Sequence, residues 1–268
     1  MRAIVSGTGE MGRLVTGTLE AEPSVEIVGV LEPLAGQTAP HQERYRSGSG
    51  ADYPLADDPE ALFRATRPDL VVDFTNAQAT PRLIDAVLAA GVRPVIGTSG
   101  VPQEEVARLR SGLAAHRLGG VIAANFALGA VVQMHLARIA ARFFDAAEVI
   151  ELHHDRKADS PSGTALATAR GMREARDSDF AHPDPELEHE GAEGARGAAL
   201  GGVGIHSVRL PGLVAHQEVI LGGRGQTLSL RHDTTGRESF MPGVLLAVHA
   251  VMGLDGLAEG LDSLIGLS

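Results

Sequence analysis

The sequence has no cysteine among its 268 residues, and this absence removes several kinds of chemistry. Without thiols the chain forms no disulfide, offers no thiolate nucleophile and builds no cysteine-ligated zinc site. Histidine and carboxylate side chains remain as the only strong metal ligands.

Long apolar runs and an excess of positive charge are also lacking. No stretch approaches the ~20 consecutive apolar residues of a membrane-spanning helix. Acidic residues outnumber lysine and arginine by 34 to 23. The resulting net charge of −11 argues against nucleic acid as a partner, because phosphate binding depends on a basic surface. The first residues run directly into a strand-like segment and leave no room for a signal peptide. We therefore expect a soluble, cytoplasmic protein without membrane or nucleic-acid partners.

The first 126 residues alternate short β-branched runs with helical stretches. Such alternation is typical of βαβ units, which build a parallel sheet covered by helices. We predict an α/β fold whose first domain, residues 1–126, is a Rossmann-type doubly wound parallel sheet. Its expected strands are 3–5, 25–30, 70–72, 94–96 and 120–123, and its expected helices are 11–20, 59–66, 80–90 and 103–116.

The pattern changes after about residue 127, which predicts a second, α+β domain over residues 127–239 with a mixed or antiparallel sheet. Residues 177–202 lack apolar periodicity and are expected to form a long loop without packed elements. Short connectors between the three strand-like runs that follow favour antiparallel pairing. The expected elements are helices at 131–144, from about 164 and at 240–252, and strands at 147–153, 203–210, 213–221 and 226–232.

Gly7, Gly9 and Gly12 match G-x-G-x-x-G directly after the first predicted strand and at the start of a helix. In this context, backbone N–H groups and the helix dipole bind the pyrophosphate of a dinucleotide. Glu32 stands twenty residues beyond Gly12, where a carboxylate accepts hydrogen bonds from the adenosine ribose. The alternative, a tight turn in a chain with 33 glycines, explains the glycines but not Glu32.

Three further segments end predicted strands: Asp-Phe-Thr at 73–75, Gly-Thr-Ser-Gly at 97–100 and Ala-Ala-Asn-Phe at 123–126. Ligands of doubly wound sheets bind beyond the carboxyl ends of the strands, so all three segments could line one crevice. Each alone is weak evidence, because strand-to-helix loops need such residues merely to turn.

Residues 151–165 are the most informative stretch of the chain. Four of the five residues from His153 to Lys157 are or can become cationic, so this patch would attract a di-acid. The following Pro-Ser-Gly-Thr opens a helix and offers hydroxyls and unpaired N–H groups to a carboxylate. Histidine supplies protons near neutral pH, and lysine does so when its pKa is lowered.

Simpler explanations exist for the same residues. Ser162 could be an N-cap and Thr164 an early helical hydroxyl. His153 and His154 point to opposite faces if the strand continues through both, so at most one need be catalytic. The histidine pair has no third ligand at a recognisable spacing, and we expect no metal site.

The stretch resembles the signature of the dihydrodipicolinate reductase family, with Glu151 preceding the motif His153-His154-x-x-Lys157-x-Asp159-x-Pro161-Ser162-Gly163-Thr164-Ala165. Similarity in order extends over nearly the whole chain, through blocks at 7–12, 73–75, 97–100, 123–126 and from 206–209 to Phe240.

The resemblance implies reduction of 4-hydroxy-tetrahydrodipicolinate or dihydrodipicolinate to tetrahydrodipicolinate by NADH or NADPH, in the diaminopimelate route to lysine. It implies an acid/base role for His153 and a proton-donating or electrostatic role for Lys157. Substrate carboxylates would be bound by His154, Ser162, Gly163 and Thr164. Cofactor contacts would come from Gly7, Thr8, Gly9, Glu10, Met11, Gly12, Glu32, Gly97, Thr98, Ser99, Ala123, Ala124, Asn125 and Phe126.

The resemblance also implies an assembly and a chain path. Family members are typically tetrameric through the sheet of the second domain, which would make residues 127–239 the substrate-binding and oligomerisation domain. The runs from 203 to 232 would leave a broad apolar face, which a monomer rarely exposes, and we predict a homotetramer. The C-terminal helix, about residues 240–268, would return to the first domain.

Three departures from the family concern the cofactor. The glycine turn is one residue shorter than the commonest form, Ala127 replaces a usual serine, and Pro33 follows Glu32 where some members have arginine. Glu32 would repel the 2′-phosphate of NADPH, and Pro33 supplies no cation, so we predict that NADH is used at least as well as NADPH. The cations that could partly compensate are Arg13, His41 and Arg44.

Two other functions stay open. Another NAD(P)-dependent dehydrogenase of amino-acid metabolism would share the first domain, although an aspartate-semialdehyde dehydrogenase is excluded by the missing cysteine. A catalytically inactive nucleotide-binding relative is the non-enzymatic alternative. The intact set of His153, Lys157 and Ser162-Gly163-Thr164 argues against it.

Overall fold

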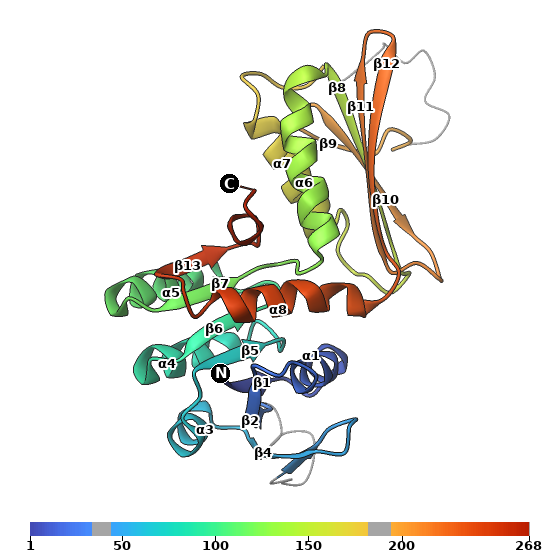
Figure 1. Cartoon of the computed structure of the whole chain (residues 1–268). Coiled ribbons are helices and arrows are strands. Elements are labelled where there is room, and N and C mark those ends of the chain that lie inside the picture. Colours follow the sequence, from blue (N-terminus) through green and yellow to red (C-terminus); the bar gives the residue numbers. More distant parts are fainter. Residues whose placement is uncertain (34–43, 182–193, 268) are drawn as a thin grey trace. The chain divides into compact units, whose positions relative to one another are not determined.

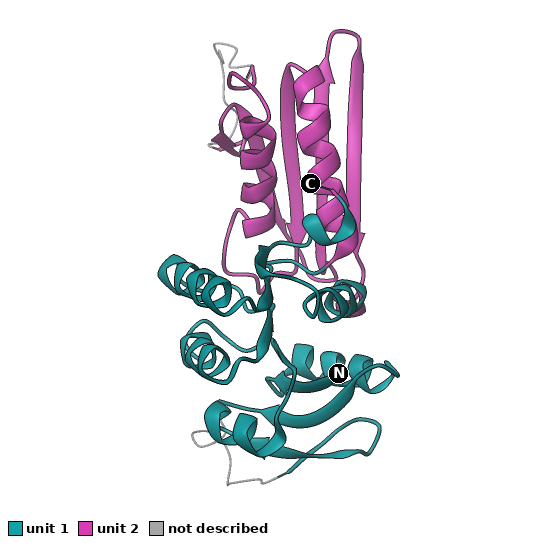
Figure 2. Cartoon of the chain, turned by 60° about the vertical axis from the view of Figure 1, so that its left-hand side comes forward, with its two compact units in different colours: residues 1–126, 240–266, 268 teal, residues 127–239, 267 magenta. Residues whose placement is uncertain are grey.

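The computed structural model describes residues 1–33, 44–181 and 194–267. The chain divides into two compact units, drawn in separate colours in Figure 2. Unit 1 contains Met1–Phe126 and Phe240–Gly266, and unit 2 contains Ala127–Ser239 and Leu267. A segment from the end of the chain thus belongs to the unit that the N-terminal part builds.

Unit 1 is built on an eight-stranded sheet in the order β13-β7-β6-β5-β1-β2-β4-β3. Every neighbouring pair is parallel except β3 with β4, so the predicted doubly wound parallel sheet is confirmed. Its strands are β1 (Arg2–Ser6), β2 (Glu26–Leu31), β3 (Arg44–Arg46), β4 (Asp52–Ala56), β5 (Leu70–Asp73), β6 (Arg93–Ile96), β7 (Gly119–Ile122) and β13 (Gly256–Glu259).

Helices cover both faces of this sheet, as Figure 1 shows. On one face, Leu62, Ile84 and Leu109 from three helices join Ile4 and Val71 of the sheet in a buried cluster. Because both faces are covered, the strands are almost continuously apolar instead of alternating. The first face carries α3 (Pro59–Thr66), α4 (Thr80–Ala90) and α5 (Gln103–His116), and the other carries α1 (Glu10–Glu20) and α8 (Met241–Ala250).

The end of the chain differs from the predicted C-terminal helix of about residues 240–268. Helix α8 ends at Ala250, after which β13 adds to the sheet in parallel with β7 and a 3-10 turn follows at Ser263–Ile265. The predicted helix over 240–252 is confirmed as α8, but its extension to about residue 268 is wrong, because β13 depends on a neighbour, β7, that lies far away in the sequence. None of the helices in the described residues is long and apolar enough to cross a membrane.

Unit 2 is built on a five-stranded mixed sheet in the order β12-β11-β8-β10-β9, which confirms the predicted sheet type. Helices α6 (Leu128–Ala140) and α7 (Gly163–Glu174) lie on one face (Figure 1), and a 3-10 turn, Ala141–Phe143, extends α6. Alternate residues of β8, namely Ala147, Val149 and Glu151, are buried on this face. The strands are β8 (Ala146–His153), β9 (Ala198–Leu200), β10 (Val203–Arg209), β11 (Ala215–Gly223) and β12 (Gln226–Thr234).

Two expectations for unit 2 need correction. The run 203–210 does not pair with 213–221, because β8 lies between β10 and β11 and pairs with β10 in parallel and with β11 antiparallel. The turn at Pro211-Gly212 therefore carries the chain across a central strand instead of closing a hairpin. The predicted loop at 177–202 contains strand β9, which pairs with β10, while its residues 182–193 lie outside the described part of the chain.

Candidate active site

The glycine turn of unit 1 leads from β1 into α1 and leaves no space for side chains at two positions. Gly7 has a φ of +107°, and a Cβ there would lie 2.9 Å from the carbonyl oxygen of Phe74. A Cβ on Gly12 would lie 1.9 Å from the carbonyl oxygen of Gly7. Helix α1 begins after Gly9, which offers no side-chain cap. This close packing matches a dinucleotide turn, in which the phosphates meet the backbone N–H groups at a helix start.

Glu32 lies beside this turn, directly after β2. Its carboxylate accepts hydrogen bonds from the backbone N–H of Thr8 at 2.9 Å and from the Thr8 hydroxyl at 2.6 Å. Arg13 donates from Nε to the carbonyl oxygen of Thr8 at 3.1 Å, and Arg44 donates to the carbonyl oxygen of Asp52. The third cation considered above, His41, lies outside the described residues.

Asp73, at the end of β5, ties together the loops that follow the central strands. Its fully buried carboxylate accepts hydrogen bonds from Thr75 at 2.8 Å, Thr80 at 3.2 Å and Thr98 at 2.7 Å. Burial raises the pKa of Asp73, although the hydroxyl hydrogen bonds oppose that rise. Sequence reasoning noted Asp73 only as a strand end. The available signal was its position as a carboxylate at the end of a strand whose other three residues are apolar.

The segment 123–126 divides into buried and accessible residues. Phe126 is 1% exposed and its ring centroid lies 5.4 Å from that of Phe74, so its side chain belongs to the core of unit 1. Ala123 is buried as well, whereas Ala124 is exposed and Asn125 is partly exposed. Side-chain contact with a ligand is therefore open to Ala124 and Asn125 but not to Phe126.

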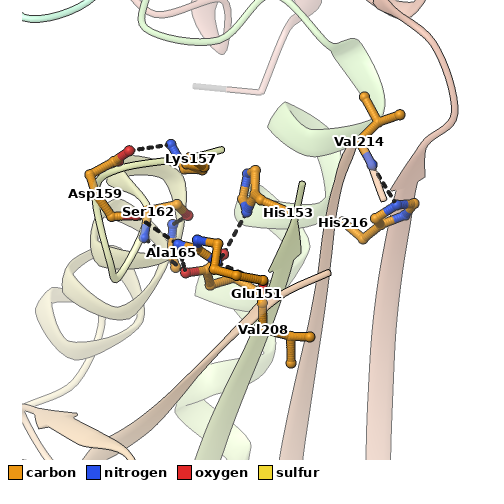
Figure 3. Close-up of polar contacts among 10 residues, drawn as sticks. Glu151, His153, Lys157, Asp159, Ser162, Ala165, Val208, Val214 and His216 are labelled. Carbon is orange, nitrogen blue, oxygen red and sulfur yellow. Dashed lines mark hydrogen bonds and ion pairs between the residues drawn. The ribbon is translucent and has the colours of Figure 1, made fainter. Parts of the chain in front are cut away.

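Glu151 is the centre of the cluster in unit 2 that Figure 3 shows. Its carboxylate has no exposed surface and is bound by Arg209 at both oxygens, at 2.8 and 2.9 Å. The same carboxylate accepts the backbone N–H of Ser162 at 3.2 Å and lies 2.5 Å from Nδ1 of His153. One side chain thus connects β8, β10 and the start of α7.

The charge of Glu151 is strongly stabilised. Burial opposes its ionisation, but hydrogen bonds from His153, Arg209 and Ser207 prevail and lower the pKa of Glu151 to about 2. The same carboxylate raises the pKa of Arg209. The pair is therefore ionised throughout the neutral range, and the carboxylate acts only as an acceptor.

The three candidate residues after Glu151 differ in their surroundings. His153 ends β8 with a side chain that is 15% exposed. Nδ1 of His154 is buried and has no hydrogen-bond partner among the described residues, which suits a group that binds a ligand. Lys157 is 22% exposed and its Nζ donates to Asp159 at 2.6 Å, which lowers the pKa of the Asp159 carboxyl.

The start of α7 shows how Ser162, an expected carboxylate-binding residue, is placed. Ser162 is 3% exposed and is indeed the N-cap, because its hydroxyl accepts the N–H of Ala165 at 3.2 Å. Its own N–H donates to Glu151 and is not available to a ligand. Gly163 is exposed, and a Cβ there would meet no atom within 4 Å. The accessible part of the helix start is therefore Gly163 with the partly exposed Thr164.

Sequence reasoning gave no role to Arg209 and only a place in a motif to Glu151. Arg209 stands opposite His153 in the parallel register of β10 with β8, which a sequence alone does not reveal.

No group of three or more histidine, aspartate and glutamate side chains within residues 1–33, 44–181 and 194–267 could hold a metal ion.

Comparison with known proteins covers both units. Family models described as "Dihydrodipicolinate reductase, N-terminus" and "Dihydrodipicolinate reductase, C-terminus" match residues 1–126 and 129–264. A 4-hydroxy-tetrahydrodipicolinate reductase from Geobacillus thermodenitrificans is 44% identical over 268 residues, with 99% of both chains covered. One from Dehalococcoides mccartyi is also 44% identical, covering 100% of this chain and 99% of that protein.

Solved structures agree with this result. A dipicolinate-bound dihydrodipicolinate reductase from Paenisporosarcina sp. TG-14 has a TM-score of 0.84 and 38% identity, with 98% of each chain covered. An amine dehydrogenase from Mycobacterium smegmatis has a TM-score of 0.61 at 16% identity, covering 96% of this chain and 94% of its own. The second likeness concerns the fold alone.

Proposed function

The chain belongs to the dihydrodipicolinate reductase family, and from this membership we propose which of its residues carry out the reaction. The protein is an NAD(P)H-dependent oxidoreductase that reduces 4-hydroxy-tetrahydrodipicolinate or dihydrodipicolinate to tetrahydrodipicolinate. This reaction belongs to the diaminopimelate route to lysine. The alignments with these two relatives cover 99% and 100% of this chain, so the similarity extends over both units.

The turn between β1 and α1 would hold the pyrophosphate of the cofactor. The tight backbone packing at Gly7 and Gly12 fits a dinucleotide turn, and Glu32 beside Thr8 fits the adenosine ribose. Further contacts would come from Thr8–Gly12, Gly97–Ser99 and Ala123–Asn125, with Phe126 supporting them from the core. When bound, the nicotinamide supplies the hydride. Because Glu32 repels a 2′-phosphate, NADH is used at least as well as NADPH.

Unit 2 would bind the dicarboxylate substrate. His154 offers an unpartnered buried ring nitrogen, and Gly163 and Thr164 stand at the N-terminus of α7, which favours anions. Ser162 supports them by capping the helix. The dipicolinate that the Paenisporosarcina relative binds is a dicarboxylate of this kind, which supports the assignment.

Proton transfer would fall to His153 and Lys157. His153 is partly exposed and is held through Nδ1 by Glu151, which leaves Nε2 for the substrate. Lys157 carries three donors and a positive charge at the same end of the sheet, where it stabilises negative charge that develops on the substrate. We place the general acid at His153 and the electrostatic or donating role at Lys157.

The observation that carries this proposal is the cluster in which Glu151 joins His153 to the start of α7. A direct test couples the purified protein to the synthase that makes its substrate and follows the oxidation of NADH or NADPH. We expect oxidation only when the synthase and its substrates are all present. Absence of turnover with either cofactor in the folded protein would refute the proposal.

A further inference from the structure

We propose that Glu151 is a positioning residue: its buried carboxylate, held by Arg209, fixes the ring of His153 and the start of α7 in one arrangement. The proposal rests on the role proposed above for His153. Glu151 itself is fully buried and touches no substrate, so it acts through its partners.

The two carboxylate oxygens divide this task. Oε1 accepts from Arg209 and from the N–H of Ser162, which anchors the residue that caps α7. Oε2 accepts from Arg209 and from Nδ1 of His153. Arg209 also donates to the carbonyl oxygen of Asp159 at 2.7 Å, which anchors the loop between Lys157 and α7. A single ion pair thus sets the positions of the proton-transfer residue, the adjacent loop and the anion-binding helix start.

The chemistry of the carboxylate decides which nitrogen of His153 reacts. An ionised carboxylate can only accept, so Nδ1 must carry the hydrogen in the bond to Glu151. Nε2 is then the nitrogen that takes up and releases a proton. The charged groups around this pair are Arg209 from β10 and Lys157 and Asp159 from the loop.

Nuclear magnetic resonance of the His153 imidazole nitrogens tests this inference. In the wild type, the nitrogen shifts should show hydrogen on Nδ1 in the neutral ring. In Glu151→Gln, whose side-chain amide can donate as well as accept, we expect the Nε2–H tautomer of His153 to appear. We expect kcat to fall at least ~10-fold, while the Kd for NADH stays unchanged.

Glu148→Gln is a matched control, because Glu148 lies on the same strand and pairs with His206 at 2.8 Å on the opposite face of the sheet. It should change the nitrogen shifts of His206 and leave the tautomer of His153 unchanged. Since Glu151→Gln leaves the Arg209 charge unpaired, the double variant Glu151→Gln/Arg209→Gln provides the same readout if the single variant does not fold.

The outcomes separate the two proposals. An unchanged tautomer of His153 in the folded variants would overturn the positioning role, even if activity fell. Full activity of His153→Ala would instead refute the catalytic role of His153, while the nitrogen shifts of His153 in the Glu151 variants would still report whether Glu151 positions its ring.

Discussion

At the residue scale, the proposed roles of His153 and Lys157 predict that removing either side chain has effects that differ from those of misfolding. We expect His153→Ala and Lys157→Ala each to lower kcat by at least ~10²-fold, as for a lost general acid, with little change in the Kd for NADH. Steady-state kinetics and fluorescence titration of NADH measure the two quantities. His116→Ala is the control, because His116 is exposed in the last turn of α5. Near-normal turnover of both variants would show that the proton comes from another group.

The buried charge of Glu151 predicts how stability depends on pH. Its pKa of about 2 lies below the ordinary glutamate value, so its contribution to stability is present at neutral pH and is lost as the pH falls toward 2. Between about pH 6 and pH 3, the free energy of unfolding should fall by about 2 kcal/mol more in the wild type than in Glu151→Gln. Urea unfolding at a series of pH values measures both. Parallel curves would mean that Glu151 is not ionised as described.

We predict that Glu32 sets the preference between NADH and NADPH. Its carboxylate is held against the glycine turn by Thr8, where it can accept from both ribose hydroxyls of NADH but repels a 2′-phosphate. Arg13 is occupied at Nε by the carbonyl oxygen of Thr8. We expect kcat/KM to be at least as high with NADH as with NADPH. In Glu32→Ala, any difference in kcat/KM between the two cofactors should be smaller. A tenfold preference for NADPH, about 1.4 kcal/mol in transition-state terms, would show that a cation reaches the phosphate.

At the scale of elements, the junction of β1 with α1 depends on the absence of one side chain. A Cβ on Gly12 would lie 1.9 Å from the Gly7 carbonyl oxygen, which is backbone and cannot turn aside. Gly12→Ala should therefore displace α1 from the turn and raise the Kd for NADH by more than ~10-fold, since a small misplacement of binding groups is costly. Calorimetric titration of NADH measures this effect.

Gly17→Ala is the matched control on the same helix. A Cβ there meets nothing within 4 Å, and alanine favours a helix over glycine by up to about 1 kcal/mol. We expect unchanged NADH affinity and equal or greater thermal stability. If both alanine variants bind NADH normally, the close approach of Gly12 to Gly7 does not shape the cofactor site.

The elements that could be predicted from the sequence are those with a local signal. The parallel order of unit 1 followed from buried strands alternating with amphipathic helices, and the N-cap of α7 followed from Ser162. Strands β3, β9 and β13 have three or four residues and no useful alternation, so only their neighbours in the sheet define them. The same limit hid β8 between β10 and β11, because strand pairing is a property of distant segments.

In the candidate site, too, local features could be predicted from the sequence and contacts between distant segments could not. Local sequence was enough to propose His153, Lys157 and the start of α7 as candidates, because they lie within a dozen residues of one another. It could not identify Arg209 as the partner of Glu151, because 58 residues separate them and a parallel register brings them together. It also could not tell that the N–H of Ser162 is occupied, since its acceptor lies on another element.

At the scale of the whole molecule, the sheet of unit 2 has one face that no described helix covers. Alternate residues on this open face are partly exposed, and its apolar members are Ile150 and Leu152 of β8, Val208 of β10 and Ile220 of β11. Ion pairs between Glu148 and His206 and between Glu218 and Arg231 lie beside them. The open face is thus less uniformly apolar than the sequence suggested. A mixture of apolar and charged residues is compatible with an interface between subunits.

We predict a homotetramer in solution that buries this open face, and light scattering at micromolar concentration measures its mass. Ile220→Lys should dissociate it, because a lysine would be buried in the assembly, whereas in the free subunit it would stand opposite Glu148 in the β8–β11 register and be tolerated. Leu136→Lys tests a second apolar surface of unit 2, on α6, where Leu136 is 44% exposed and Val132 and Ile139 are exposed as well. Dissociation by Leu136→Lys but not by Ile220→Lys would place the subunit contact on the helix. A stable wild-type monomer would contradict the prediction altogether, because the open face would then be exposed in the working enzyme.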